Sequence, residues 1–481
     1  MNTLQTDLLL VMGLLLPFSV SATNGMNLEA YGTEAQGMAG ASMAYGNNSA
    51  AAMNNPATIG MLSDGRQVEL SLGFLGPHVS ATDGSETATS KADSYYMPAF
   101  GWLSRNGRLA YGVAAYAQGG MAAEYDSQSW LAAGTGLVNR SEITVGRFML
   151  PVSFELNDHW ILGGTVDFVW AGMDLQLLMP GSQFLDMMPT SLNPGAGQVA
   201  GNLTGSLLEN MAALMNLNSI RTINHAYIDF SDNSEFSGAA SGAGFAAKVG
   251  TVYHVSPDLT LGATYHSPSM LKDLRTDDVT VTMNVDIDSG ILAGGSQSGE
   301  FTTTDIPVHG VMTVNDFQWP AMFGFGGAYG GVDRWIIALD VKRIYWSQSM
   351  DRLTLEFAAD DSAMMRQFDN TNFQMRLWQR WHDQTIAALG GSYHLTSVLQ
   401  LRLGYSYASN PVPRAYINPL FPAVTRHHYT VGVGFDVMPS ATVNFSVSYA
   451  APATARNNRA MAGVSSSMRQ RNWQLGYVFR Y

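Results

Sequence analysis

The residues that could do chemistry are sparse in this chain, and its cations are the most informative of them. Lysine occurs only at positions 91, 248, 272 and 342 of the 481 residues. Lys248, Lys342 and Arg402 each lie out of phase with the apolar residues around them. Because side chains alternate along a strand, each would project from the polar face. There it could bind the carboxylate of an amphipathic ligand, or pair with an acid such as Asp167 or Asp340.

Catalytic and metal-binding patterns are not found in the sequence. The only adjacent histidines, His427 and His428, would point to opposite faces of a strand and make a poor metal site. The chain has no cysteine, nucleophile elbow, phosphate loop or paired metal-ligand spacing, so we expect no enzyme activity, metal or cofactor. A dispersed Ser-His pair stays open as the one enzymatic alternative. The net charge of −13 argues against a nucleic-acid partner.

The elements that must position the cations are predicted from alternating apolar and polar residues. The last stretch, WQLGYVFRY at 473–481, places an apolar or aromatic side chain at every odd position. This pattern recurs in pairs joined by short turns, as in 429–437 and 443–449, and the pairs are separated by long connections. We count fourteen such stretches: 68–75, 96–103, 109–116, 148–156, 161–175, 245–253, 259–265, 323–329, 335–345, 386–393, 399–407, 429–437, 443–449 and 473–481.

Short turns that alternate with long loops are typical of an outer-membrane β-barrel. We therefore predict an all-β fold over 66–481, a transmembrane antiparallel barrel of about 14 strands, with long extracellular loops at 176–241 and 267–315. Trp and Tyr at strand ends would form its interfacial girdles. An even strand number places both termini in the periplasm of a Gram-negative cell.

Two segments before the first strand lack the alternation. The apolar run 8–20 is shorter than the roughly 20 residues of a membrane-spanning helix, so 1–22 is predicted to be a signal peptide. The stretch 23–65 is rich in Gly, Ala, Asn and Met. It would form a plug, or hatch, inside the barrel lumen.

One long loop carries a predicted helix. In 206–218, apolar residues recur at helical spacing. This helix could cap the barrel mouth, or form an adaptable apolar groove together with other loop residues, although ordinary loop packing would explain them equally well. The candidate groove residues are Phe184, Leu185, Met187, Met188, Leu207, Leu208, Met211, Leu214 and Met215.

Four segments together carry a family resemblance. They are 24–62 with its Asn55-Pro56-Ala57 element, QGGMAAEY at 118–125, IYWSQ at 344–348 and SNPVP at 409–413. In this order they resemble the FadL/TodX family of outer-membrane transporters for long-chain fatty acids and other hydrophobic compounds. The resemblance covers 24–481.

The resemblance implies a monomeric barrel plugged by the hatch, a hydrophobic groove among the outer loops and a tighter pocket in the upper lumen. It also implies lateral release into membrane lipid through a kinked third strand. Glycine weakens a strand, so Gly119 and Gly120 are the expected gate. The aromatic terminus at Tyr481 fits the signal that barrel-assembly machinery reads in barrels it resembles.

The expected ligand is a long-chain fatty acid, with Lys248, Lys342 or Arg402 as candidate contacts for its carboxylate. However, the sequence has Gly172 near where the family's carboxylate-binding residue would fall. A neutral or aromatic hydrocarbon is therefore the alternative ligand. A general porin or an adhesin is a more distant alternative. A porin should lack the segment before the barrel and line its pore with charge.

Overall fold

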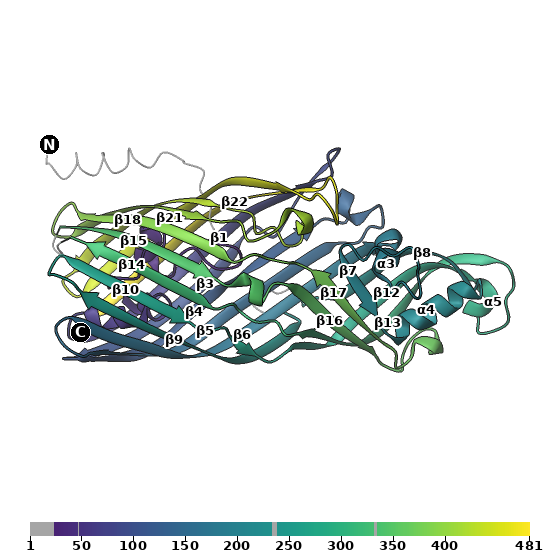
Figure 1. The fold of residues 1–481 in the computed structure, drawn as a ribbon, viewed down its shortest axis with the longest axis horizontal. Helices are drawn as coiled ribbons and strands as arrows, with labels where there is room; N and C mark the ends of the chain where they lie inside the picture. The colour runs from purple at the N-terminus through teal and green to yellow at the C-terminus, as the bar shows by residue number, and fades with distance from the viewer. Residues whose placement is uncertain (1–23, 47, 233–237, 331–333) are drawn as a thin grey trace.

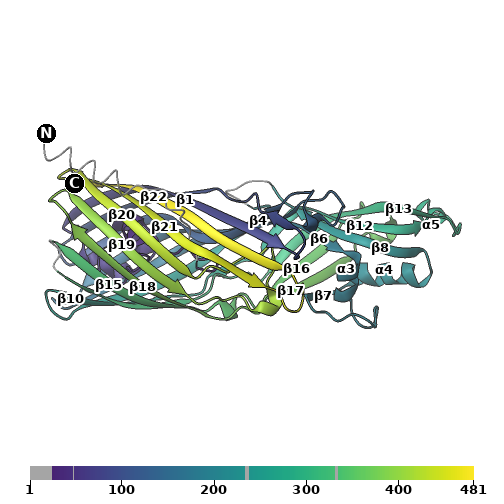
Figure 2. The same ribbon diagram turned by 90° about the horizontal axis from the view of Figure 1, so that it is seen from above.

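The computed structural model describes residues 24–46, 48–232, 238–330 and 334–481. The predicted signal peptide, 1–22, lies outside these residues. The described chain forms a closed antiparallel β-barrel, which confirms the predicted fold class (Figures 1 and 2). No helix in this part of the chain is long and apolar enough to cross a membrane.

Each strand of the barrel wall is hydrogen-bonded to the next over at least part of its length, and the ring closes where β22 pairs with β1, at Gln67 opposite Arg480. In order around the ring its strands are β1 (Gly65–Thr82), β3 (Tyr95–Asn106), β4 (Leu109–Tyr125), β5 (Asn139–Glu155), β6 (Trp160–Pro180), β9 (Ala240–His254), β10 (Leu259–His266), β14 (Met322–Tyr329), β15 (Trp335–Ile344), β18 (Gln384–His394), β19 (Leu399–Ala408), β20 (His427–Met438), β21 (Ala441–Arg456) and β22 (Ser465–Arg480).

The outer surface of the barrel is apolar, as the alternation predicts. In β9, Phe245 and Val249 are exposed on one face of the strand, while Lys248 on the other face is buried. In β22, Leu475 and Tyr477 are exposed while Gln474 is buried. A water-soluble protein rarely exposes so extensive an apolar surface, whereas lipid requires it.

The whole sheet has 22 strands over the described residues, more than the fourteen stretches predicted from the sequence. The additional strands lie in connections that were predicted as loops. They are β2 (Thr87–Thr89), β7 (Gly201–Thr204), β8 (Ile220–Phe230), β11 (Met270–Leu271), β12 (Leu274–Asp288), β13 (Phe301–Asn315), β16 (Arg352–Ala359) and β17 (Asn372–Trp378). Strand β12 shows why they were missed: Val281, Met283 and Val285 are buried on one face, but its other face is polar and suits water rather than lipid.

Six of these strands, β7, β8, β12, β13, β16 and β17, project beyond the barrel with three short helices, and we call this part the extension (Figures 1 and 2). The helices are α3 (Gly181–Met187), α4 (Ser206–Asn216) and α5 (Ser289–Leu292). Helix α4 confirms the helix predicted within 206–218 and packs against β8 and β17. At α5, Asp288 accepts backbone N–H groups of Ser298, Gly299, Ile291 and Gly290, which lower the pKa of its carboxyl to about 2.

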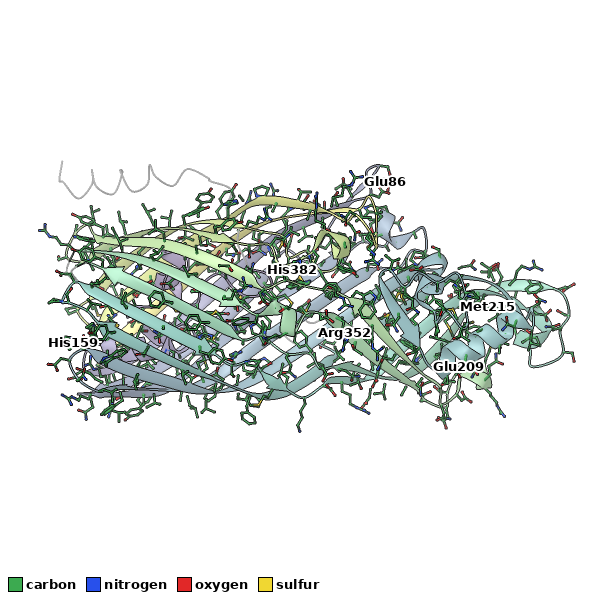
Figure 3. The ribbon with its side chains drawn as sticks, viewed as in Figure 1. Glu86, His159, Glu209, Met215, Arg352 and His382 are labelled. Atoms are coloured by element: carbon green, nitrogen blue, oxygen red, sulfur yellow. The ribbon has the colours of Figure 1, made fainter. Side chains whose placement is uncertain are left out.

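The two ends of the barrel differ. The end next to the extension is the loop end, and the opposite end, with the short turns and the carboxy-terminus, is the turn end. Figure 3 labels Glu209 and Met215 in the extension and His159 at the turn end. Short 3-10 helices in the connections are η3 (Trp130–Ala132), η4 (Trp346–Gln348), η5 (Arg366–Phe368) and η6 (Arg414–Tyr416).

Residues 24–62, here the N-terminal segment, occupy the barrel interior (Figure 1). Its helix α2 (Thr33–Gly37) packs against β19 to β22, and η2 (Pro56–Met61) packs against β5, β6 and β9. A further 3-10 turn, η1 (Asn48–Ala52), lies against β1, β3, β4 and β5. Nearly every side chain of the segment is buried, so the lumen at this level is filled with protein.

A candidate opening in the barrel wall

The wall is interrupted between β3 and β4. Their ladder runs from Asn106 opposite Leu109 only as far as Phe100 opposite Ala115. Beyond that point β3 stays paired with β1 and β4 stays paired with β5. The part of β3 from 95 to 99 therefore has no ladder partner on β4 in the described chain.

The predicted gate glycines lie beside this interruption, inside β4 rather than at the start of a loop. The register between β4 and β5 shifts between Ala117 and Gly119, which is a β-bulge. Gly119 has a φ of +153° and bridges to Asn27 of the N-terminal segment, and the Gly120 N–H donates to the Met26 carbonyl at 2.9 Å.

Only glycine fits both positions. A Cβ on Gly119 would lie 2.2 Å from the carbonyl oxygen of Met26, and one on Gly120 would lie 2.2 Å from that of Ile143. The first contact keeps the N-terminal segment against β4, and the second keeps β4 against β5. The two glycines thus join the kinked wall to the segment inside the barrel.

A cavity of about 310 Å³ fills the interruption, a size that suits a small molecule. Leu28 of the N-terminal segment borders it on the inside, and the exposed side chains Tyr96 and Trp170 border it on the outside. The rest of its lining comes from Gly25, Leu75, Pro77, Tyr95, Met97, Pro98, Ala115, Tyr116, Ala117, Gly119, Gly120, Met121, Ala122, Glu142, Ile143, Thr144, Val145, Gly146, Ala423, Met468 and Gln470. No lysine, arginine or histidine of the described chain is in this lining.

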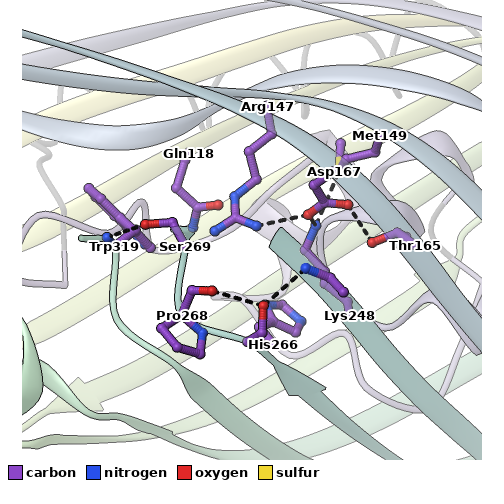
Figure 4. Close-up of polar contacts among 12 residues, drawn as sticks. Gln118, Arg147, Met149, Thr165, Asp167, Lys248, His266, Pro268, Ser269 and Trp319 are labelled. Atoms are coloured by element: carbon purple, nitrogen blue, oxygen red, sulfur yellow. Dashed lines mark hydrogen bonds and ion pairs between the residues drawn. The ribbon is translucent and has the colours of Figure 1, made fainter. Parts of the chain in front are cut away.

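The first predicted cation, Lys248, does not line the cavity and forms an ion pair with Asp167 (Figure 4). Its Nζ lies 2.5 Å from Oδ2 of Asp167, which also accepts from Arg147 Nη1 at 2.8 Å. The Thr165 hydroxyl donates to the other carboxylate oxygen of Asp167. All four side chains are buried. Sequence reasoning missed Arg147, although it lies out of phase with the exposed Phe148 and so carries the same signal as Lys248.

The second predicted cation, Lys342, contacts the N-terminal segment. Its Nζ donates to the Gly40 carbonyl at 2.6 Å and lies 3.9 Å from Asp340 Oδ2. That oxygen of Asp340 also accepts the backbone N–H groups of Ser42 at 2.6 Å and Met43 at 3.1 Å. Both ions thus fix the segment against β15 and leave the cation buried.

The third predicted cation, Arg402, faces the turn end. Its guanidinium donates to Asn444 at 2.9 Å and to Gln400, and it lies 3.4 Å from Glu34 of the N-terminal segment. It lines a polar cavity of about 640 Å³ beneath the segment. This cavity is separate from the one at the wall interruption.

The Asn55-Pro56-Ala57 element fastens the segment to the opposite wall. Asn55 caps η2 by accepting the Ala57 N–H at 3.1 Å, and its side-chain amide donates to the carbonyls of Met43 at 2.7 Å and Thr251 at 3.1 Å. A Cβ on Gly250 would lie 2.0 Å from the Asn55 side-chain oxygen. Asn55 can therefore lie this close to β9 only because residue 250 is glycine.

The predicted groove residues lie in the interior of the extension. Phe184, Met187, Met188, Leu207, Leu208, Met211 and Leu214 are buried, and Leu185 and Met215 are partly buried. A cavity among these side chains measures only about 10 Å³, with Phe184, Leu207 and Leu208 in its lining. In this structure they form a packed core, rich in methionine, that continues into the barrel.

The fold and the wall cavity define an outer-membrane transport channel, and the comparisons with known proteins agree. The model of the family described as "Outer membrane protein transport protein (OMPP1/FadL/TodX)" matches residues 15–480. The chain belongs to this family of outer-membrane transporters of hydrophobic compounds, which are channels and not enzymes.

Solved structures share the fold over nearly the whole chain. The Pseudomonas putida toluene transporter TodX is 25% identical, with a TM-score of 0.76 over 95% of this chain and 99% of that one. The Ralstonia pickettii toluene transporter TbuX is 24% identical, with a TM-score of 0.72 over 95% and 99% of the two chains. A Pseudomonas aeruginosa FadL homologue is 17% identical, with a TM-score of 0.67 and the same coverage. The last two likenesses show the fold alone.

A curated relative matches a shorter stretch. It is an uncharacterized protein from the 5′ region of the phosphoenolpyruvate carboxykinase gene of Chlorobium limicola, 40% identical over 78 residues. The match spans 16% of this chain and 38% of that protein's length. It adds no information on ligand.

Proposed function

We propose that this channel takes up small neutral hydrophobic molecules, aromatic hydrocarbons foremost, and releases them sideways through the interruption between β3 and β4. This proposal replaces the fatty-acid expectation with the alternative ligand class. The observation that carries it is the cavity at the interruption, which is lined mainly by apolar and aromatic side chains and, over the described residues, by no lysine, arginine or histidine. The 25% identity to TodX, a toluene transporter, supports the same ligand class.

The energetics favour a neutral ligand. An aromatic hydrocarbon gains roughly 25 cal/mol for each Å² of apolar surface that it removes from water. A carboxylate would need a cation or several hydrogen-bond donors to offset its lost hydration. Lys248, Lys342 and Arg402 already have partners, and none lines the cavity.

The proposed route follows the apolar interior. A molecule enters among the methionines of the extension, which can repack around different shapes, and passes into the upper lumen. The N-terminal segment acts as the hatch that bars the direct path and directs the ligand to the wall.

The loop end faces outward and the turn end faces the periplasm, so both termini are periplasmic. We propose a monomer that is inserted through its closing strand β22 by barrel-assembly machinery and surrounded by outer-membrane lipid.

Uptake of radiolabelled toluene and oleate tests the ligand class, in cells that lack their own transporters of this type. We expect the chain to accelerate toluene uptake several-fold and oleate uptake little. Acceleration of oleate uptake without an effect on toluene would contradict the proposal. A general porin would instead accelerate uptake of polar solutes such as sugars.

A cavity-filling variant tests the exit. Ala117 lines the cavity, so Ala117→Trp should block toluene uptake. Ala387 is exposed on the outer face of β18, and Ala387→Trp is the matched control that should leave uptake unchanged. Equal uptake by the two assembled variants would count against lateral exit at this position.

A further inference from the structure

We infer that Glu142 makes the wall opening selective against anions, so that the channel separates a neutral molecule from the carboxylate of equal chain length. This inference rests on the proposed function. It starts from the cavity at the wall interruption, where Glu142 is the only Asp, Glu, Lys, Arg or His in the lining over the described residues.

The position of Glu142 is set by the sheet register. On β5, Thr144 lies opposite Gly120 of the proposed gate, and Glu142 is the next residue on the same face, opposite Ala122. Two residues along a strand span about 7 Å. Glu142 therefore lies one step toward the loop end from the gate, at the edge of the opening.

The ion pairs of Arg140 next to Glu142 include more carboxylates than cations. Arg140 Nη2 donates to Glu142 at 2.9 Å and lies 3.6 Å from Asp174, while Arg140 Nη1 lies 3.3 Å from Glu124. We call these four side chains the acidic cluster. One guanidinium faces three carboxylates, and Asp174 also accepts from neutral donors, including the Ala239 N–H at 2.7 Å.

Burial strengthens this field at the opening. The side chains of Glu142 and Asp174 are 3% and 0% exposed, and the two residues lie directly opposite each other on β5 and β6. Water screens charges poorly in such surroundings. A ligand carboxylate that entered the cavity would lose hydration, meet no cation in the lining and approach a carboxylate. A neutral ligand would pay none of these costs.

The test compares n-dodecanol with dodecanoate at about pH 8, where carboxylic acids are ionised. The two molecules share one hydrocarbon chain and differ in the charge of the head group. We expect the wild-type chain to take up dodecanol much faster. Glu142→Gln should raise dodecanoate uptake about tenfold relative to dodecanol uptake.

Glu124→Gln is the matched control. Glu124 belongs to the same acidic cluster and contacts the same arginine, but it does not line the cavity and its side chain is 29% exposed. This variant should keep the wild-type ratio of dodecanol to dodecanoate uptake.

Two results would overturn the inference. One is equal wild-type uptake of dodecanol and dodecanoate, a comparison that needs no variant. The other is an assembled Glu142→Gln chain whose uptake ratio matches that of wild type. Both differ from failure of the proposed function, in which the wild-type chain accelerates uptake of neither toluene nor dodecanol.

Discussion

At the scale of single residues, the lumen contains buried charged side chains that form ion pairs with one another. Asp167 is the most committed of them, because Lys248 and Arg147 both donate to its carboxylate. An uncompensated buried charge is far more costly than a missing neutral contact. The stability of this part of the wall should therefore depend on the single negative charge between two cations.

Replacing Asp167 with asparagine should destabilise the folded barrel by about 3–5 kcal/mol, because two buried cations would face a neutral amide. Urea unfolding in detergent measures the change. Asp436, which is exposed at the turn end of β20, offers the matched control Asp436→Asn, with an expected change of about 0–1 kcal/mol. Similar midpoints for the two variants would mean that the buried cations do not depend on Asp167.

At the scale of elements, β4 combines the features that a lateral exit needs: a bulge, a missing ladder to β3 and a bridge to the N-terminal segment. These features meet at Gly119. Its Cβ position is occupied by the Met26 carbonyl, so a side chain there must displace the segment or straighten the strand.

Gly119→Val should therefore lower toluene uptake several-fold while the barrel still assembles. Gly391 in β18 is the control, because a Cβ there would meet only the Ile336 carbonyl at 3.8 Å. Assembly of both variants can be followed by the heat-dependent shift in gel mobility of folded barrels. Wild-type uptake rates in assembled Gly119→Val would speak against a gate at the bulge.

The sequence predicted the barrel strands well, because lipid on one side and lumen on the other impose an alternation of apolar and polar residues. Strands of the extension carry the same alternation, but they lie within the long connections that were interpreted as loops. The strand predicted at 109–116 extends to Tyr125 in the structure. The interruption beside it depends on which residues of β3 and β4 are not paired. No pattern within a single strand reports that failure.

Of the residues predicted from the sequence, Gly119 and Gly120 line the cavity at the interruption, whereas Lys248, Lys342 and Arg402 lie outside it. Sequence reasoning missed Tyr96, Trp170 and Glu142, which line the cavity. Aromatic residues occur along the whole outer surface, and acids occur in most of the long connections. Only the register of β3 to β6 brings these three together.

At the scale of the whole molecule, the N-terminal segment fills the lumen and the wall contains the proposed exit. The segment is fastened on several sides, by Asp340 and Lys342 of β15, by Arg402 of β19 and through Asn55 to β9. A barrel of this size would otherwise leave an aqueous channel. In the proposed function, the molecule is closed to water along its axis and releases apolar molecules through its side.

Deletion of residues 24–62 should convert the barrel into a water-conducting pore. Planar bilayers measure this directly, and the wild-type chain should show little conductance beside large, steady steps in the deletion variant. A deletion variant that stays closed would show that other parts of the chain fill the lumen. The wild-type record also tests the porin alternative, which requires conductance without deletion.

The central claim is that ligand leaves through the wall between β3 and β4, and a reversible lock across the interruption tests it most directly. Pro98 of β3 and Ala117 of β4 line the cavity from the two strands. Because the chain has no cysteine of its own, the double variant Pro98→Cys and Ala117→Cys can be joined specifically by a short, cleavable thiol cross-linker. Toluene uptake should fall to the level of cells without the protein when the lock is closed and recover when it is cleaved. Uptake that continues unchanged through the locked wall would contradict lateral release.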